Sequence, residues 1–218
     1  MDGALTIEVG AGPIVLLGER AAWLPEHRLL LVADAHLGKA QAFRRLGVPV
    51  PAGTTAENLR RLGDLIARMQ PGEVVFLGDL LHAREGRSPA TMAAIGRWRQ
   101  AHAGVPMRLV RGNHDSRAGD PPGDWDFAVV DEPWRVGGWA LCHHPQFLPG
   151  AYVLAGHEHP CVVLGSGVGR LRLPCFHLRC DAGLLPAFGE FTGGHAIRRR
   201  PGDRVVAIVD GVPRLLPG

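Results

Sequence analysis

Four short apolar runs in this chain each end within three residues of an aspartate, asparagine or histidine. The runs are LLLV at 29–32, VVFL at 74–77, MRLV at 107–110 and YVLA at 152–155. Apolar runs of this length between polar residues are typical of buried β-strands. Functional groups in open α/β sheets collect at the carboxyl ends of the strands, because the loops there meet in one crevice. The polar side chains after these runs are therefore predicted to converge on a single site.

Five polar segments, most of them placed directly after these runs, carry the side chains of that predicted site. They are Asp34-Ala35-His36, Gly78-Asp79, Gly112-Asn113-His114-Asp115, His143-His144 and Gly156-His157-Glu158-His159. Oxygen and imidazole ligands suit manganese, iron or zinc, and the segments offer no thiolate for a softer metal. Residues two apart in an extended segment point the same way, so each D-x-H or H-x-H pair is expected to reach one ion.

Helical spacing is confined to the first half of the chain, whereas strand-like runs dominate the second half. The segments 37–46, 54–70 and 89–103 are predicted helices, and Thr54 with Glu57 forms a candidate capping box for the second of them. The 218 residues are enough for one domain with a sizeable core. We expect a single α/β domain over 1–218, in which sheet layers pack together and helices flank them.

The composition is that of an ordinary globular protein and excludes several classes. Hydrophobic residues make up 46% and charged residues 21%, so the chain is not intrinsically disordered. No apolar run approaches the roughly 18 residues of a membrane span, and the start MDGALTIEVG does not read as a secretory signal. The net charge of +3 is too small to identify a partner. We therefore expect a cytoplasmic protein without a membrane partner.

The motif order D-x-H, G-D, G-N-H-D, H, G-H-x-H resembles the calcineurin-like metallophosphoesterase superfamily. The resemblance implies a four-layer α/β sandwich, with two mixed β-sheets flanked by helices, and two divalent metal ions. Carried over to this chain, one ion takes Asp34, His36, Asp79 and His159, and the other takes Asp79, Asn113, His143 and His157, so that Asp79 bridges them. A metal-activated hydroxide would then attack phosphorus, while His114 assists the leaving group.

The resemblance leaves the roles of several neighbouring residues open. His143 is favoured over His144 as the ligand, since only one of the pair can face the metals if residues 139–142 form a strand. His82 stands where protein Ser/Thr phosphatases have an aspartate, and it is similar to a histidine of DNA nucleases in the superfamily. It either orients the substrate or is a hydrogen-bonded structural histidine. With His114 and Asp115, it is a candidate catalytic residue.

The whole chain resembles the bacterial ligase-associated DNA damage response metallophosphoesterases of the PdeM type. The shared features are ADAHLGK at 33–39, Phe43-Arg44-Arg45-x-Gly47, G-D-L-x-H, HHP, GHEHP and LPAFGEFTGG at 185–194. The resemblance implies a manganese-dependent endonuclease of DNA repair, with iron or zinc as the alternative metals. It also implies partners of the same pathway, namely an ATP-dependent DNA ligase, a helicase and an exonuclease.

Basic residues beside the motifs favour DNA as the substrate. Four of them follow or flank the first three motif loops and are candidate ligands for flanking phosphates: Lys39, Arg44, Arg84 and Arg111. Trp125 and Trp134 are candidates for stacking on unpaired bases, which favours single-stranded over duplex DNA. The late basic turn at 198–200 is not assigned to the site.

Two other functions are compatible with the same residues. A small-molecule phosphatase or cyclic-nucleotide phosphodiesterase would use an identical metal site, so the motifs do not exclude it. A non-catalytic subunit that binds DNA or partner proteins in a repair complex is the alternative of another class. The intact set of ligands disfavours that last alternative.

Overall fold

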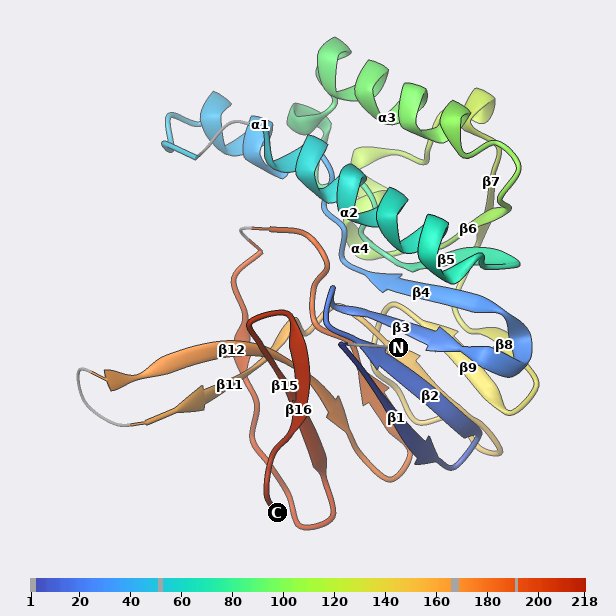
Figure 1. The fold of residues 1–218 in the computed structure, drawn as a ribbon. Helices are drawn as coiled ribbons and strands as arrows, with labels where there is room; N and C mark the ends of the chain where they lie inside the picture. Colours follow the sequence, from blue (N-terminus) through green and yellow to red (C-terminus); the bar gives the residue numbers. More distant parts are fainter. Residues whose placement is uncertain (1–2, 51–52, 166–168, 191) are drawn as a thin grey trace.

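The computed structural model describes residues 3–50, 53–165, 169–190 and 192–218, and its β-strands form two mixed sheets (Figure 1). The first sheet has seven strands in chain order. Its first four strands pair antiparallel and its last four pair parallel. The strands are β1 (Ala4–Val9), β2 (Gly12–Leu17), β3 (Ala21–Leu24), β4 (Leu29–Ala33), β5 (Glu73–Leu77), β6 (Met107–Val110) and β7 (Phe127–Val130).

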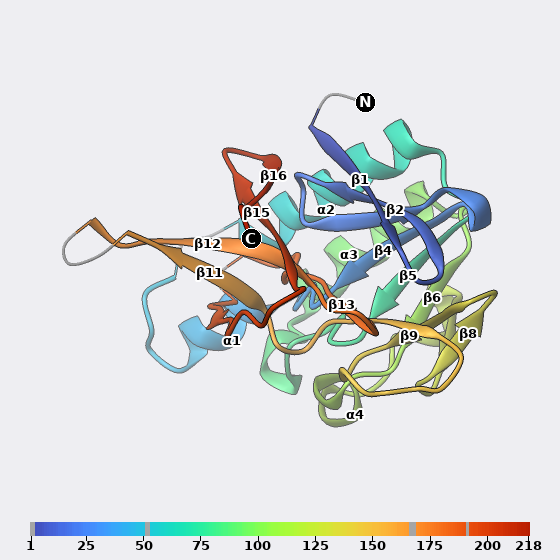
Figure 2. The same ribbon diagram turned by 90° about the horizontal axis from the view of Figure 1, so that it is seen from below.

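The second sheet has nine strands, with a parallel centre formed by the neighbours β13, β10 and β9. The strands are β8 (Trp134–Val136), β9 (Trp139–Cys142), β10 (Tyr152–Ala155), β11 (Pro160–Leu164), β12 (Leu171–Leu178), β13 (Ala182–Leu184), β14 (His195–Ala196), β15 (Arg204–Val209) and β16 (Val212–Leu215). The first half of β12 pairs with β11, and its second half pairs with β13 and β15. The β11–β12 hairpin therefore extends beyond the sheet, and it projects from the body in both ribbon views (Figure 1, Figure 2).

The described chain contains four α-helices and three short 3-10 turns. They are α1 (Lys39–Arg45), α2 (Thr54–Met69), α3 (Pro89–Ala101), α4 (Asn113–Ala118), η1 (Pro25–His27), η2 (Arg84–Gly86) and η3 (Gly123–Trp125). The three predicted helices are confirmed to within two residues at each end. The predicted capping box of α2 is wrong, because Gly53 is the N-cap residue and no side chain caps the helix. Packing of its apolar face stabilises α2 instead.

Side chains of the first sheet alternate between two separate cores. On one face, Leu30 and Val32 of β4 pack in a cluster with the apolar residues of α2 and α3. On the other face, Leu31 and Val75 pack in a cluster that includes Phe176 of the second sheet. Successive side chains of a strand point to opposite faces. Strands that are apolar throughout, such as LLLV and VVFL, therefore fit a sheet that is buried on both faces.

The predicted α/β sandwich of two mixed sheets is confirmed. α2 and α3 form the outer layer over the first sheet. On the outer face of the second sheet, Leu148 and Ala151 of the loop between β9 and β10 pack over Ala140 and Val153. A loop thus packs on this part of the outer face. Within the described ranges, no helix is both long and apolar enough to cross a membrane.

Candidate metal centre

The predicted ligands lie at one end of the two sheets, each just past a strand. Asp34 follows β4, Asp79 follows β5 and Asn113 follows β6, and these strands are parallel neighbours. His143 follows β9 and His157 follows β10, which form another parallel pair. Because parallel neighbours end on the same side of a sheet, the five loops converge.

Glycines in two motifs let these loops approach the carboxylates closely. A Cβ on Gly112 would lie 2.5 Å from Asp79 Oδ1, and a Cβ on Gly156 would lie 2.5 Å from Asp34 Oδ2. Glycine is the residue that permits such a close backbone approach. The first position of the G-N-H-D and G-H-E-H motifs is thus explained by packing against a predicted ligand.

The backbone is left-handed at five of the predicted ligands. The φ angles are 52° at Asp34, 44° at His36, 51° at Asp79, 67° at His157 and 45° at His159. This conformation costs a residue with a side chain about 1–2 kcal/mol, and such outliers cluster at functional sites. The expectation that each pair lies in an extended segment is wrong, although Asp34 and His36 do fall in one ligand group as expected. Tight turns instead send the two histidines of the G-H-E-H motif into different ligand groups.

The first ligand group contains Asp34, His36 and His159, whose ligand atoms lie within 4.8 Å of one another. His36 Nε2 is 3.3 Å from His159 Nε2. His159 Nε2 is in turn 3.4 Å from Asp34 Oδ1. Asp79 Oδ2 lies 3.8 Å from His36 Nε2. These four side chains are the set that the superfamily resemblance gives to one ion.

The second ligand group is centred on His143. Its Nε2 lies 2.9 Å from Asn113 Oδ1 and 3.1 Å from His157 Nδ1. Asp79 Oδ1 is 3.6 Å from the same nitrogen. Asp79 therefore turns one carboxylate oxygen toward each group, an arrangement that would let one carboxylate serve both ions.

His143 and His144 point to different partners. The His143 ring is buried, and its Nδ1 donates to the Leu77 carbonyl at 3.0 Å, which leaves the Nε2 lone pair for a cation. The His144 Nδ1 instead lies 2.7 Å from Glu132 Oε1. Glu132 Oε2 accepts the backbone N–H groups of both histidines, at 2.7 and 2.8 Å. Glu132, which the motifs did not indicate, thus fixes the loop that presents His143.

Alanine at these two positions is expected to separate their roles. His143→Ala removes the Nε2 at the centre of the second group. Losing a residue that only hydrogen-bonds to a metal ligand typically weakens metal binding by about 10–100-fold. Because His143 is itself a proposed ligand, His143→Ala should weaken metal binding by more than that. His144→Ala leaves that nitrogen in place and should bind metal like the wild type. Mass spectrometry of bound metal after dialysis measures both variants, and equal losses would contradict the choice of His143.

The unpaired atoms of the two groups fit divalent cations. Asp34 Oδ1 is buried and has no hydrogen-bond partner in the described part of the chain, although buried polar atoms are normally paired. Burial and the neighbouring Asp34 raise the pKa of Asp79, because the two carboxylates repel each other. Burial lowers the pKa of both His36 and His143, so their rings are neutral, the form that binds metal. Cations would relieve the repulsion and use the free lone pairs.

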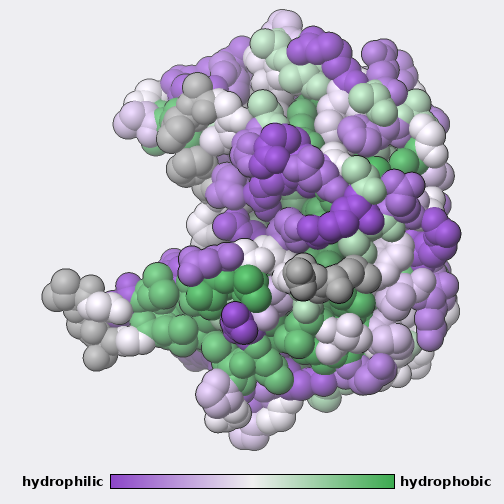
Figure 3. All heavy atoms as spheres, viewed as in Figure 1, coloured by the Kyte–Doolittle hydropathy of each residue, from purple (hydrophilic) through white to green (hydrophobic). Residues whose placement is uncertain are grey.

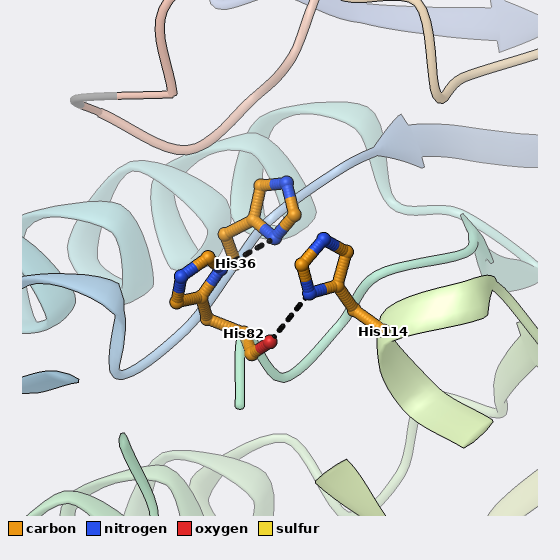
Figure 4. A group of neighbouring side chains, drawn as sticks. All are labelled: His36, His82 and His114. Atoms are coloured by element: carbon orange, nitrogen blue, oxygen red, sulfur yellow. Dashed lines mark hydrogen bonds between the residues drawn. The ribbon is translucent and has the colours of Figure 1, made fainter. Parts of the chain in front are cut away.

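His82 contacts both a predicted ligand and His114 (Figure 4). Its Nδ1 is 3.4 Å from His36 Nδ1, and its backbone carbonyl accepts a hydrogen bond from His114 Nδ1 at 2.7 Å. The rings of His82 and His114 stack with their centroids 5.0 Å apart. Burial lowers the pKa of His82 to about 4, so the ring is neutral. These contacts favour the hydrogen-bonded alternative, in which His82 orients its two neighbours.

Asp115 has a structural role where a catalytic one was expected. Its buried carboxylate accepts the backbone N–H groups of Gly112, Asp79 and Leu80 at 2.9, 2.7 and 3.0 Å. Burial raises the pKa of Asp115 to about 6, although these donors favour the charged form. Since both oxygens are committed to the backbone, Asp115 ties the loop after β6 to the loop after β5.

Lys39 and Arg84, two of the predicted phosphate ligands, lie near the centre. Lys39 is half-buried at the start of α1. Burial lowers its pKa, while the charges of Asp34 and Asp79 act in the opposite direction. Arg84 is exposed in η2, and its Nε donates to the Arg117 carbonyl at 3.0 Å. Both cations therefore remain candidates for contacting a substrate phosphate.

The other two predicted phosphate ligands, Arg44 and Arg111, contact side chains of the protein itself. Arg111 pairs with both Asp120 and Asp131, so its charge is already balanced. Arg44 is exposed on α1 and donates to Gln41 Oε1 at 3.0 Å. Arg111 is therefore a weaker candidate for phosphate binding than its place beside the third motif suggested.

The tryptophans expected to stack on bases are packed within the protein, so that expectation is wrong. Trp125 is only 5% exposed and belongs to the core beneath α3. Trp134 packs on the core between the sheets, and the Arg108 guanidinium lies 4.1 Å from its ring centroid. Among the described residues, Phe147 is an exposed aromatic ring that the sequence motifs did not indicate, with 72% of its surface exposed. Its position in the proline-containing loop just after His143-His144 was the available signal.

Two pockets adjoin the ligand groups. One of about 210 Å³ is lined by His159 together with Arg20 and Arg172. The other, of about 460 Å³, is lined by Asn113 and His144 among others. The space-filling view shows the molecule hollowed between the part that carries α1 and the projecting β11–β12 hairpin (Figure 3). The centre thus borders open surface beyond both groups, which suits a substrate larger than the reacting phosphate.

Comparison with known proteins gives a family and one close structural relative. Residues 27–145 match the family described as calcineurin-like phosphoesterase. The crystal structure of Pseudomonas putida nuclease MPE is 44% identical in sequence, covers 98% of this chain and 100% of that chain, and has a TM-score of 0.87. Yfce, a phosphoesterase from E. coli, is 17% identical, covers 85% of this chain and 95% of that chain, and has a TM-score of only 0.43. None of the curated proteins compared with the chain matches it.

Proposed function

This chain belongs to the calcineurin-like phosphoesterase family and is a metal-dependent phosphoester hydrolase, and from that premise we propose that it is an endonuclease acting on single-stranded or unpaired DNA. The observation that carries the proposal is the 44% identity, over 98% of the chain, to a protein described as a nuclease. The pockets beyond both ligand groups support it, since a polymer needs binding surface on either side of the cut.

The proposed ligands are Asp34, His36, Asp79 and His159 for one ion and Asp79, Asn113, His143 and His157 for the other. Divalent ions held there would supply an activated water and neutralise charge on the phosphate. Contacts within the protein hold these ligands in place. His143 is fixed by the Leu77 carbonyl, and Asp79 is shared by both groups.

His114 is the proposed general acid. Its Nδ1–H is donated to the His82 carbonyl, so Nε2 is the ring atom left to face the reaction. That atom lies 3.9 Å from Asp79 Oδ2, at the edge of the ligand groups. A proton on Nε2 can pass to the leaving oxygen as the phosphorus–oxygen bond breaks. His82 acts as the positioning residue, because it contacts both His114 and His36.

Two cations, of which Arg84 is exposed and Lys39 half-buried, and an exposed aromatic ring support a single strand as the substrate. Lys39 and Arg84 stand beside the first two motif loops, where they can contact flanking phosphates. Phe147 follows His143, in the fourth ligand-bearing loop, and offers a face on which an unpaired base can stack. Stacking of this kind tolerates any base, so we expect little sequence preference.

The sequence resemblance to ligase-associated phosphoesterases supports three finer parts of the proposal. Manganese is the proposed metal, because imidazole and carboxylate ligands suit it and the motifs contain no thiolate. Iron and zinc are compatible with the same ligands. The proposed setting is DNA repair, in a pathway with an ATP-dependent DNA ligase, a helicase and an exonuclease.

Nicking of covalently closed circular single-stranded DNA tests the proposal. Metal-stripped protein is assayed with manganese, iron or zinc added back. A circle has no ends, so its linearisation shows endonuclease activity, and we expect it with manganese. If the circle stays intact while bis(p-nitrophenyl) phosphate is hydrolysed, the DNA proposal fails and a small-molecule phosphodiesterase takes its place.

A further inference from the structure

A basic pocket of about 430 Å³ lies outside the two ligand groups. It is lined by Arg179, Arg198, Arg200, His177 and His195, with Glu158 and Pro160 on its wall. Its volume falls within the roughly 300–1,000 Å³ typical of small-ligand sites. Arg198 and Arg200 come from the basic turn at 198–200, a feature of the sequence that the proposed mechanism does not use.

The pocket lies on the outer face of the second sheet. Along β12, Phe176 and Leu178 point into the core between the two sheets. Side chains alternate along a strand, so His177 and the following Arg179 point to the opposite face. The pocket is therefore built on the side of β12 that faces away from the first sheet.

Hydrogen bonds hold the basic turn firmly against β12. Asp203 Oδ2 accepts from the buried His177 Nε2 at 2.7 Å and from the Arg200 backbone N–H at 2.9 Å. The Asp203 N–H in turn donates to the Arg200 carbonyl at 3.0 Å. The Asp203 carboxylate is thus engaged with the ring and the backbone, so it fixes the turn without pairing with the Arg200 guanidinium.

The pocket carries an excess of positive charge. Among the described residues that line it, three are arginines and Glu158 is the acidic one, an excess of +2. Glu158 lies 3.5 Å from Arg179, which balances its charge. Arg198 and Arg200 are both exposed. These two guanidinium groups are suited to an oxyanion, which arginine can bind through paired hydrogen bonds.

Two residues that line the pocket neighbour proposed metal ligands in the sequence. Glu158 stands between His157 and His159, one residue from a proposed ligand of each ion. Pro160 lines this pocket and also the smaller pocket beside His159. A DNA strand that passes the exposed His157 therefore has the basic pocket within the same segment of the surface, beside Glu158.

We propose that this pocket binds a backbone phosphate of the DNA strand several nucleotides from the cut, through Arg198 and Arg200. This inference rests on the proposed function. Each phosphate contact of a single strand releases about 0.7 counterions, which at about 0.1 M salt is worth about 5-fold in affinity. Strands long enough to place this phosphate in the pocket should therefore gain about 5-fold over a dinucleotide.

An oligothymidylate length series tests the pocket. kcat and KM are measured from the dinucleotide to a twenty-mer for the wild type and for Arg198→Gln/Arg200→Gln, both loaded with the metal that gives activity. Arg97→Gln is the matched control, since Arg97 is exposed on α3, beyond the first sheet. We expect the double variant to show an about 5-fold higher KM on the twenty-mer and an unaltered kcat. The slope of its log–log salt dependence should be smaller by about 0.7.

The outcomes separate this inference from the proposed function. A double variant that keeps the wild-type KM on long strands overturns the inference, while the protein remains a nuclease. Equal losses on the dinucleotide and the twenty-mer also overturn it, because the arginines would then act through the metal centre. A wild type that hydrolyses bis(p-nitrophenyl) phosphate but cuts no strand of any length refutes the proposed function itself.

Discussion

Replacing Asp79 with asparagine is expected to remove bound metal and catalytic activity together. Asp79 turns one oxygen toward His36 and the other toward His143, so the amide loses the charge shared by both groups. Asparagine tolerates the left-handed backbone at this position better than alanine does. We expect kcat to fall by more than about 10⁴-fold, the upper end for losing a single acid–base group. Metal content per protein and initial rates on a small diester measure the two effects.

The chain offers a closely matched control for this substitution. Asp210 is exposed in the turn between β15 and β16 and has the same left-handed backbone, with φ of 49°. Asp210→Asn should keep both metal and activity. An Asp79→Asn protein that holds its full metal complement would show that this carboxylate does not bridge two ions.

His114→Ala is expected to lower turnover by about 10²–10⁴-fold while leaving the metal content unchanged. The His114 ring reaches the edge of the ligand groups, with its Nε2 3.9 Å from Asp79 Oδ2, but it belongs to neither proposed ligand set. The loss should be smaller for a diester with a p-nitrophenol leaving group than for DNA, because such a leaving group needs little protonation. That comparison tests the role of general acid.

His102→Ala is the control for His114→Ala. The His102 ring lies at the end of α3 and contacts the Trp98 carbonyl at 2.8 Å, away from the proposed ligands. It should change neither turnover nor metal content. A His114→Ala protein that loses its metal would instead identify His114 as a ligand.

The strands and the convergence of the ligand-bearing loops were readable from the sequence because both follow from local pattern. LLLV and VVFL are apolar at every position, as a strand between two cores must be. Strands that end side by side bring the residues after them together. Asp34 and Asp79 could therefore be placed near each other without knowledge of the loops between them.

Other features depend on contacts between distant segments, and local pattern does not encode them. The left-handed turns at His36 and His159 are maintained by the surrounding loops, so their φ angles contradict the extended geometry that spacing alone predicts. Asp115 sits in a catalytic-looking motif, yet its partners are N–H groups from the loop after β5. Trp125 follows a polar loop, but it is buried against α3 and the first sheet.

The loops that bear the proposed ligands are bound to one another by bonds that require no metal. Asp34 Oδ2 accepts the His157 N–H at 2.9 Å, and Asp79 Oδ1 accepts the His114 N–H at 2.9 Å. The carboxylates of Asp115 and Glu132 likewise accept hydrogen bonds from backbone N–H groups of these loops. Because these bonds involve no ion, we expect the loops to keep their arrangement when metal is absent. We therefore expect metal to be removed and replaced without unfolding, so that the ion bound in the cell would follow from which divalent ions are available.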